Sequence, residues 1–223
     1  MEKPSILKQQ MLTNTETMKK QTRLFSNLFL FLFSTSSALA QIDFQKEDQV
    51  FNGKDLNNWT VIPETQVNSW NAKNGILYAK SDAAETGSNL WTTMEYEDFA
   101  VQLQFKMGGG IVDSGVFIRG ENPESPQIQI GISGSLKVDM TGSPYVPKQV
   151  YPAKAEVENL LNVKGWNTML IKAVKNHYEV WLNGEGVLDY TLDNASLQGP
   201  VGLQLHPGRT MDIMFKEIYI KKL

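Results

Sequence analysis

Residues 99–107 read FAVQLQFKM, in which large apolar side chains alternate with small or polar ones. Successive side chains of a β-strand point to opposite faces of the sheet, so this period of two predicts a half-buried antiparallel strand. The same theme returns in SGVFIRG (114–120), PQIQIGI (126–132), NTMLIKAV (167–174), HYEVWLNG (177–184), VGLQL (201–205) and MDIMFKEIYIKKL (211–223). Many short strands at this spacing predict a single all-β domain, either a sandwich or a jelly roll.

Turn signals separate the expected strands, and helical signals are few. Asn183-Gly184 is a good hairpin signal, and Pro207-Gly208 marks another turn. Only the segment AKAEVENLLNV, residues 153–163, could form two or three helical turns before Gly165 ends it. We therefore expect at most one short helix in the domain.

The N-terminal 40 residues have the three parts of a secretory signal peptide. A basic part (Lys19, Lys20 and Arg23) precedes an apolar part at 28–33 and a small-x-small pattern at 38–40. The pattern predicts Met18 as the physiological start, cleavage after Ala40, and one domain over residues 41–223. The apolar run is far shorter than the roughly 20 residues of a spanning helix. We therefore expect a periplasmic or secreted protein without a stable membrane span.

Composition excludes several classes of function. The chain has no cysteine, which excludes disulfides, thiolate metal sites and a lipoprotein anchor. Removal of residues 1–40 takes away five basic and two acidic residues, so the formal charge of −3 becomes −6. An acidic chain without a basic cluster is a poor candidate for binding nucleic acid. The spacing of the two histidines indicates no transition-metal site, and we expect no cofactor.

Seven segments, taken in order, resemble a known family. They are VFNGKDLNNWTV (50–61), WNAKNGILYAK (70–80), YEDFAVQLQFKM (96–107), DSGVFIRG (113–120), GWNTMLIKA (165–173), EVWLNG (179–184) and GPVGLQLHPG (199–208). Together they resemble the 3-keto-disaccharide hydrolase domain family. The resemblance implies a concanavalin A-like jelly-roll sandwich of two antiparallel sheets. It also implies a place in bacterial sugar catabolism, after an oxidoreductase has made a 3-keto sugar. Where many members have a glutamate and then an aspartate, this chain has Gln127 and Ile132.

The chemistry that the resemblance implies needs few catalytic groups. A 3-keto group acidifies the hydrogen on carbon 2, so the glycosidic bond can leave by elimination and water can then add. Such a site needs a base near carbon 2, a donor or cation at the carbonyl oxygen, and an acid at the leaving oxygen. The close carboxylate pair of ordinary glycosidases is not required.

Four residues are the candidates for these catalytic roles. Arg119 could hold sugar hydroxyls or an enolate oxygen, or could be a surface arginine at the end of a strand. SLKVDM (135–140) repeats the two-residue spacing of a strand, which would place Lys137 and Asp139 on one strand face. Lys137 could then stabilise the enolate and Asp139 could act as base or hydroxyl ligand; the alternative is a surface ion pair. His206 is the candidate acid or base, because an unperturbed histidine titrates near neutral pH.

Amide and aromatic side chains are the candidates for sugar binding. Amides donate and accept hydrogen bonds, which suits sugar hydroxyls, and aromatic rings can stack on sugars. Solvated positions on an outer sheet face are the alternative for the glutamines. The predicted binding residues are Gln127, Gln129, Tyr145, Gln204, Trp91 and Trp70.

Three functions follow from these observations. The leading hypothesis is a secreted enzyme that cleaves a 3-keto-glycoside, a small-molecule substrate, by hydrolysis or elimination. A non-catalytic, lectin-like carbohydrate-binding module is the second, because one fold serves many functions. A structural envelope protein is the third.

Overall fold

A computed structural model describes residues 42–223 of the chain. The predicted signal peptide, the start at Met18 and the cleavage after Ala40 lie outside the described residues. Within the described range, no helix has the length and apolar character needed to cross a bilayer. Residues 43–223 form one compact unit.

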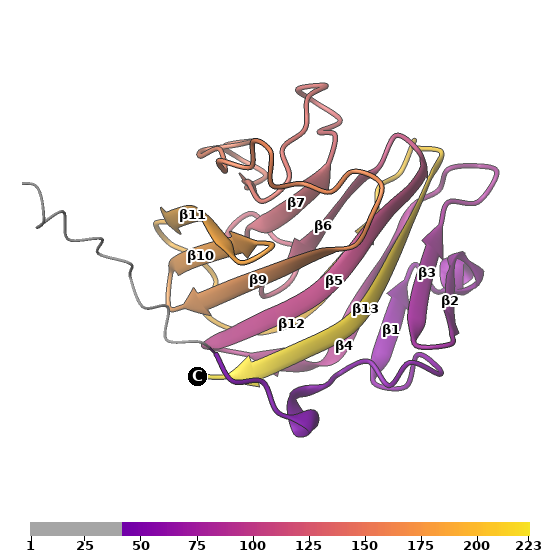
Figure 1. The fold of residues 1–223 in the computed structure, drawn as a ribbon, viewed down its shortest axis with the longest axis horizontal. Helices are drawn as coiled ribbons and strands as arrows, with labels where there is room; N and C mark the ends of the chain where they lie inside the picture. Colours follow the sequence, from indigo (N-terminus) through magenta and orange to yellow (C-terminus); the bar gives the residue numbers. More distant parts are fainter. Residues whose placement is uncertain (1–41) are drawn as a thin grey trace, which may run out of the picture. The chain divides into compact units, whose positions relative to one another are not determined.

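Within residues 42–223, thirteen strands form two antiparallel sheets that pack face to face (Figure 1). The six-stranded sheet has the order β1 (Trp59–Ile62), β4 (Ser88–Tyr96), β12 (Gly199–Leu205), β6 (Asp113–Phe117), β7 (Gln127–Gly131) and β8 (Pro144–Tyr145). The seven-stranded sheet has the order β11 (Glu185–Thr191), β10 (His177–Leu182), β9 (Asn167–Val174), β5 (Phe99–Gly110), β13 (Met211–Lys222), β3 (Ile76–Lys80) and β2 (Trp70–Lys73). The predicted all-β sandwich of two antiparallel sheets is confirmed.

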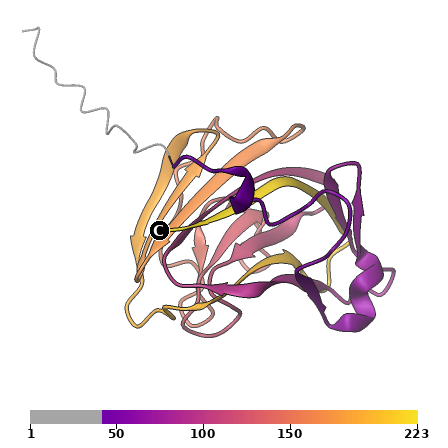
Figure 2. The same ribbon diagram turned by 90° about the horizontal axis from the view of Figure 1, so that it is seen from below.

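The core lies between the two sheets, which Figure 2 shows as separate layers. In β5, Phe99, Val101, Leu103 and Phe105 are all fully buried, as the alternation at 99–107 predicts. Each such side chain contributes roughly 1.5–3 kcal/mol by leaving water. On the central strands, the side chains of the inner face therefore belong to the core. The side chains of the outer face remain free to form a site.

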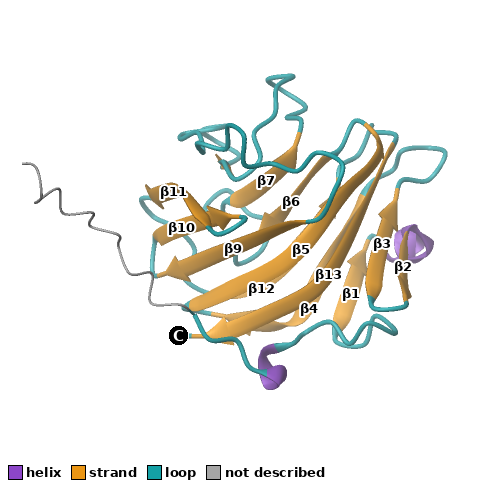
Figure 3. Cartoon of the chain, in the orientation of Figure 1, coloured by secondary structure: helices purple, strands orange, loops and turns teal. Residues whose placement is uncertain are grey.

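The predicted helix at 153–163 is wrong. The described residues contain two short 3₁₀ helices, Lys46–Asp48 and Glu64–Ser69, shown in purple in Figure 3. The segment 153–163 is a loop in which the backbone N–H of Glu156 donates to Val187 of β11. Its apolar side chains pack against the core, so tertiary contacts outweigh a weak helical preference.

Candidate functional site

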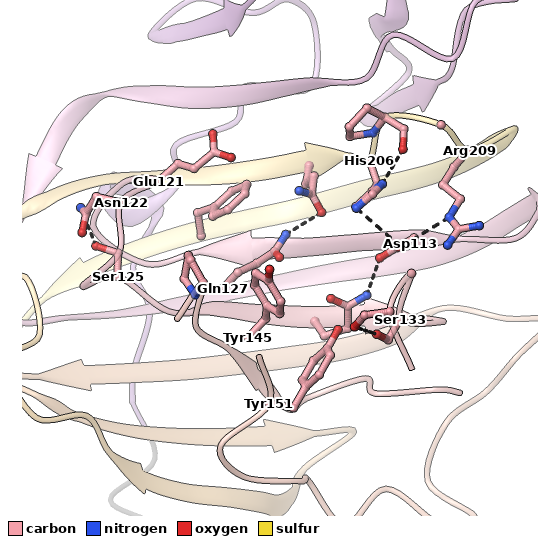
Figure 4. Close-up of a pocket in the computed structure, with 18 residues that line it drawn as sticks. Asp113, Glu121, Asn122, Ser125, Gln127, Ser133, Tyr145, Tyr151, His206 and Arg209 are labelled. Carbon is pink, nitrogen blue, oxygen red and sulfur yellow. Dashed lines mark hydrogen bonds and ion pairs between the residues drawn. The ribbon is translucent and has the colours of Figure 1, made fainter. Parts of the chain in front are cut away.

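A pocket of about 620 Å³ lies on the outer face of the six-stranded sheet. Strands β6, β7 and β12 form its floor, because side chains two apart on each strand point away from the core. Loops after β6, β7, β8 and β12 complete the wall. The lining residues are Asp113, Phe117, Glu121, Asn122, Ser125, Gln127, Gln129, Ser133, Gly134, Ser135, Tyr145, Pro147, Tyr151, Gln204, His206, Pro207, Gly208 and Arg209 (Figure 4).

Two glycines allow large side chains to lie flat on this face. A Cβ atom at Gly115 of β6 would lie 2.6 Å from the Gln127 amide nitrogen, closer than atoms can approach. At Gly202 of β12, a Cβ would lie 2.4 Å from the ring of Trp91. Each glycine therefore leaves space for a side chain from a neighbouring strand to lie against the sheet. As a result, these side chains do not fill the pocket.

A buried carboxylate marks one end of the pocket. The Asp113 side chain is 3% exposed, and its Oδ1 accepts a hydrogen bond from Gln129 Nε2 at 2.7 Å. Asp113 Oδ2 lies 3.5 Å from Arg209 Nε and 3.8 Å from His206 Nε2. Oδ2 and Arg209 Nε are buried and have no hydrogen-bond partner among residues 42–223. Buried polar atoms are normally satisfied, so these two orphan atoms point to a site that completes its hydrogen bonds with a ligand or water.

A contact of His206 with the backbone indicates which nitrogen of its ring carries the hydrogen. His206 Nδ1 lies 2.6 Å from the backbone oxygen of Pro207, an arrangement that is favourable when Nδ1 carries the hydrogen. In the neutral ring, Nε2 then has the lone pair. The side chain is 37% exposed and lines the pocket. His206 Nε2 is therefore the ring atom that can accept a proton, and it lies 3.8 Å from Asp113 Oδ2.

Tyr151 supplies a phenol that stays protonated. Burial raises the pKa of the Tyr151 hydroxyl to about 12, because the ionised form would lose its hydration. The charges of Asp113 and Tyr145 act in the same direction, and a hydrogen bond with Ser133 acts against them. The Tyr145 and Tyr151 rings meet edge-on, with 5.5 Å between their centroids. Tyr151 is therefore a neutral hydrogen-bond donor at physiological pH.

The raised pKa of Tyr151 predicts a loss of stability at alkaline pH. A tyrosine in the unfolded chain ionises near pH 10, so between about pH 10 and 12 the unfolded state releases a proton that the folded state retains. The free energy of unfolding should fall over this window and not below it. Replacement of Tyr151 by phenylalanine should reduce that fall by about 1–2 kcal/mol. Urea denaturation at several pH values measures the difference, and equal pH slopes for the two proteins would contradict it.

Amide side chains form hydrogen bonds across the pocket floor, over the central strand β6. Gln127 Nε2 of β7 donates to Gln204 Oε1 of β12 at 2.7 Å. At the far end, Asn89 Nδ2 of β4 donates to Glu121 Oε2, also at 2.7 Å. These bonds hold the amides in fixed orientations and leave other donors and acceptors of the same groups available for a ligand.

Five of the predicted site residues line the pocket, and their roles stay predictions. They come together because β7, β8 and β12 carry them to the same face of one sheet. These residues are Gln127, Gln129, Tyr145, Gln204 and His206.

Arg119 does not line the pocket, and its predicted position is wrong. Strand β6 ends at Phe117, and Arg119 has a left-handed backbone with φ of 63°, which breaks the strand alternation. Its guanidinium is buried and donates to the backbone oxygens of Glu97, Lys175 and Ser196. Arg119 therefore joins three connections at one end of the sandwich.

Lys137 and Asp139 do not line the pocket either, because the predicted strand at 135–140 is a turn. Lys137 has a φ of 60°, is exposed, and bonds through its ammonium to the backbone oxygen of Gly134. Asp139 Oδ1 accepts from the backbone N–H of Thr141 at 2.8 Å. Both side chains stabilise the local loop, and the predicted base and enolate stabiliser are corrected.

The two predicted tryptophans also lie outside the pocket lining. Trp70 is 4% exposed, belongs to the core, and donates from Nε1 to Ser88 Oγ at 2.8 Å. Trp91 is 8% exposed and packs against Phe117 with ring centroids 5.1 Å apart. Trp70 is a packing residue, and Trp91 supports a ring that does line the pocket.

Sequence reasoning missed Asp113, Arg209 and Tyr151. Asp113 had a usable signal, because it lies in phase with Phe117 on one face of the strand 113–117. Arg209 follows a turn and Tyr151 lies in a loop, so neither had a periodic pattern. Within residues 42–223, no group of three or more His, Cys, Asp or Glu side chains could hold a metal ion.

Solved structures with the same fold include carbohydrate-related proteins. A "putative glycosyl hydrolase" from Parabacteroides distasonis is 26% identical with a TM-score of 0.58, over 77% of this chain and 96% of that chain. A second one from the same organism is 21% identical with a TM-score of 0.59, over 81% and 98%. A carbohydrate-binding module of Bacillus subtilis is 15% identical with a TM-score of 0.51, over 74% and 96%. The last two show the fold alone, a lectin-like jelly roll.

The family match covers most of the chain. No protein with a curated function matches the sequence. Residues 46–221 match the family model described as the 3-keto-alpha-glucoside-1,2-lyase-like domain, which confirms the resemblance seen in the sequence. With this match over nearly all of the described residues, the chain belongs to the 3-keto-alpha-glucoside-1,2-lyase-like domain family.

Proposed function

We propose that the pocket binds a 3-keto-glycoside and cleaves its glycosidic bond by elimination. One observation carries the proposal: the buried Asp113 lies beside His206 and Arg209, and its Oδ2 has no hydrogen-bond partner among residues 42–223. A buried carboxylate with a cation and a histidine at a pocket is an arrangement suited to proton transfer. The family match and the location of the predicted signal peptide support a sugar-active protein that acts outside the cytoplasm.

His206 is the base in this proposal. Nε2 takes the proton from carbon 2, and the C–H electrons form an enolate with the carbonyl at carbon 3. The carbonyl then re-forms, a double bond forms between carbons 1 and 2, and the bond from carbon 1 to the leaving oxygen breaks. The proton then passes from the imidazolium to the leaving oxygen. The products are an alcohol and an unsaturated keto sugar, so no water is consumed in this step. Asp113 stabilises the imidazolium while it exists.

Arg209 and Tyr151 stabilise the charge that develops on the carbonyl oxygen. Removal of the carbon 2 proton puts negative charge on the oxygen at carbon 3. Arg209 Nε faces Asp113, and the two terminal guanidinium nitrogens make no hydrogen bond within residues 42–223, so their N–H groups remain available to that oxygen. Tyr151 stays protonated and can donate as well. Donors placed before the reaction cost no reorganisation when the charge appears.

The carboxylates of the pocket do not fit the usual glycosidase arrangement. The pocket lining has two carboxylates, Asp113 and Glu121, and Figure 4 shows them at opposite ends of the pocket. Asp113 is buried and paired with Arg209. Retaining and inverting glycosidases use two carboxyl groups that flank the scissile bond closely, about 5–10 Å apart, with one of them acting as a general acid. Elimination assisted by a carbonyl needs only one base and a stabilised enolate.

The test compares a 3-keto-glucoside with its unoxidised parent glucoside. The purified protein should release the aglycone from the keto substrate alone and produce the absorbance of a conjugated enone. A substrate with deuterium at carbon 2 should react more slowly if proton removal limits the rate. Binding of either sugar without release would contradict the proposal and would identify a carbohydrate-binding module.

A further inference from the structure

The two ends of the pocket differ in charge, because Arg209 and Asp113 offset each other at one end, whereas Glu121 at the other end has no cationic partner among residues 42–223. Arg209 lies beside Asp113 at one end, and Glu121, Asn122 and Ser125 lie at the other (Figure 4). Glu121 forms no ion pair with any residue of 42–223, whereas its neighbour Glu124 lies 3.3 Å from Lys148. The far end is therefore the acidic end of the pocket.

The Glu121 carboxylate is held in place through one oxygen. Its Oε2 accepts from Asn89 Nδ2 at 2.7 Å, and Asn89 lies opposite Gln204 in the β4–β12 register. Gln204 in turn accepts from Gln127, so the carboxylate belongs to the row of amides on the pocket floor. Glu121 Oε1 takes no part in the hydrogen bonds of the described residues. One oxygen is fixed and the other is available to a ligand.

The groups around Glu121 leave few other polar contacts open. Asn122 Nδ2 donates to Ser125 Oγ, and Ser125 Oγ donates to the backbone oxygen of Arg119. Asn122 Oδ1 accepts from the backbone of Glu124 and from Ser196. The wall at this end also includes the Phe117 ring, which packs against Trp91. A carboxylate oxygen and an aromatic ring that line the same pocket are groups that attract a cation more than a neutral hydroxyl.

We propose that this end is a subsite for a leaving group that carries a protonated amine, such as an amino sugar. The inference rests on the proposed function, because it places the bond to be broken between the Arg209 end and the Glu121 end. The developing enolate then faces the guanidinium, and the ammonium faces Glu121 and Phe117. The charge pattern orients the substrate and makes Glu121 a specificity-determining residue.

The test measures binding in the absence of turnover. Glucosamine, glucose and N-acetylglucosamine are titrated into the protein near pH 6 and low salt, with NMR or calorimetric detection. Glucosamine should bind about three- to tenfold more tightly than either neutral sugar, since Glu121 is exposed and water weakens the pair. Glu121→Gln should abolish this preference, and Glu124→Gln is the matched control that should retain it. Added salt should weaken the preference of the unmodified protein.

Two results would overturn the inference. Glucosamine could bind no more tightly than the neutral sugars, or Glu124→Gln could remove the preference as fully as Glu121→Gln does. Failure of the proposed function has a different signature: a preference for glucosamine that depends on Glu121, in a protein that releases nothing from 3-keto-glycosides. The binding assay and the turnover assay therefore fail independently.

Discussion

Replacement of Arg119 by methionine is expected to lower the free energy of unfolding by about 3–5 kcal/mol. The guanidinium is buried and donates to the backbone oxygens of Glu97, Lys175 and Ser196, which belong to three separate connections. Methionine can fill the space between the Phe99 and Tyr178 rings but can donate to none of these oxygens. Buried carbonyls without donors then destabilise the folded state. Urea denaturation followed by tryptophan fluorescence measures the loss.

A surface ion pair provides the control for the Arg119 variant. Lys172 and Glu179 pair at 2.8 Å and are partly exposed, so Lys172→Met should cost about 1 kcal/mol or less. The folded fraction of the Arg119 variant should still bind sugar, because the guanidinium does not line the pocket. An Arg119→Met variant that is as stable as the unmodified protein but no longer binds sugar would contradict this. It would support the sequence-based prediction that Arg119 binds the substrate.

Replacement of His206 by glutamine is expected to lower kcat for a 3-keto-glycoside by about 10²–10⁴-fold. Glutamine can keep a contact to the Pro207 backbone, but it cannot accept the proton from carbon 2. The stability should change by about 0.5 kcal/mol or less, because the side chain is 37% exposed. Steady-state kinetics and urea denaturation together separate a loss of chemistry from a loss of fold.

The second histidine of the chain is the matched control for His206. His177 lies on β10 of the other sheet, with Nε2 2.7 Å from Asp189, and does not line the pocket. His177→Gln should leave kcat unchanged. Asp113→Asn should lower kcat while His206 is still present, because the imidazolium loses its carboxylate. Full activity in the His206 variant would remove the histidine from the mechanism.

The fold was largely predictable because its information is local. The alternation at 99–107 and in the other strand segments predicts which side chains face the core. Because each sheet then has one apolar face, two sheets pack face to face as a sandwich. The predictions of secondary structure were wrong in segments where the pattern of apolar side chains is short or interrupted. The segment 153–163 forms a loop that packs on the core, and 135–140 forms a turn instead of a strand. Neither outcome can be derived from propensity, since contacts with distant strands decide both.

The site was predictable only where a residue continues a regular strand. Gln127 and Gln129 keep the phase of β7, and Gln204 and His206 keep the phase of β12, so all four reach the pocket. Arg119 was misplaced because the strand ends two residues earlier and the left-handed backbone turns the side chain into the interior. Lys137 and Asp139 were misplaced for a similar reason.

The sequence by itself determined the all-β class, the family, and the division of each strand into a core face and an outer face. These properties depend on side-chain order along the chain, which the period of two expresses directly. The tertiary structure alone decided that Asp113, His206 and Arg209 meet, because β6 and β12 pair in space although they are far apart in sequence. It also decided that Arg119 is buried among backbone carbonyls. Strand pairing brings together residues that are far apart in the sequence. The groups that meet in the pocket could therefore be identified only from the tertiary structure.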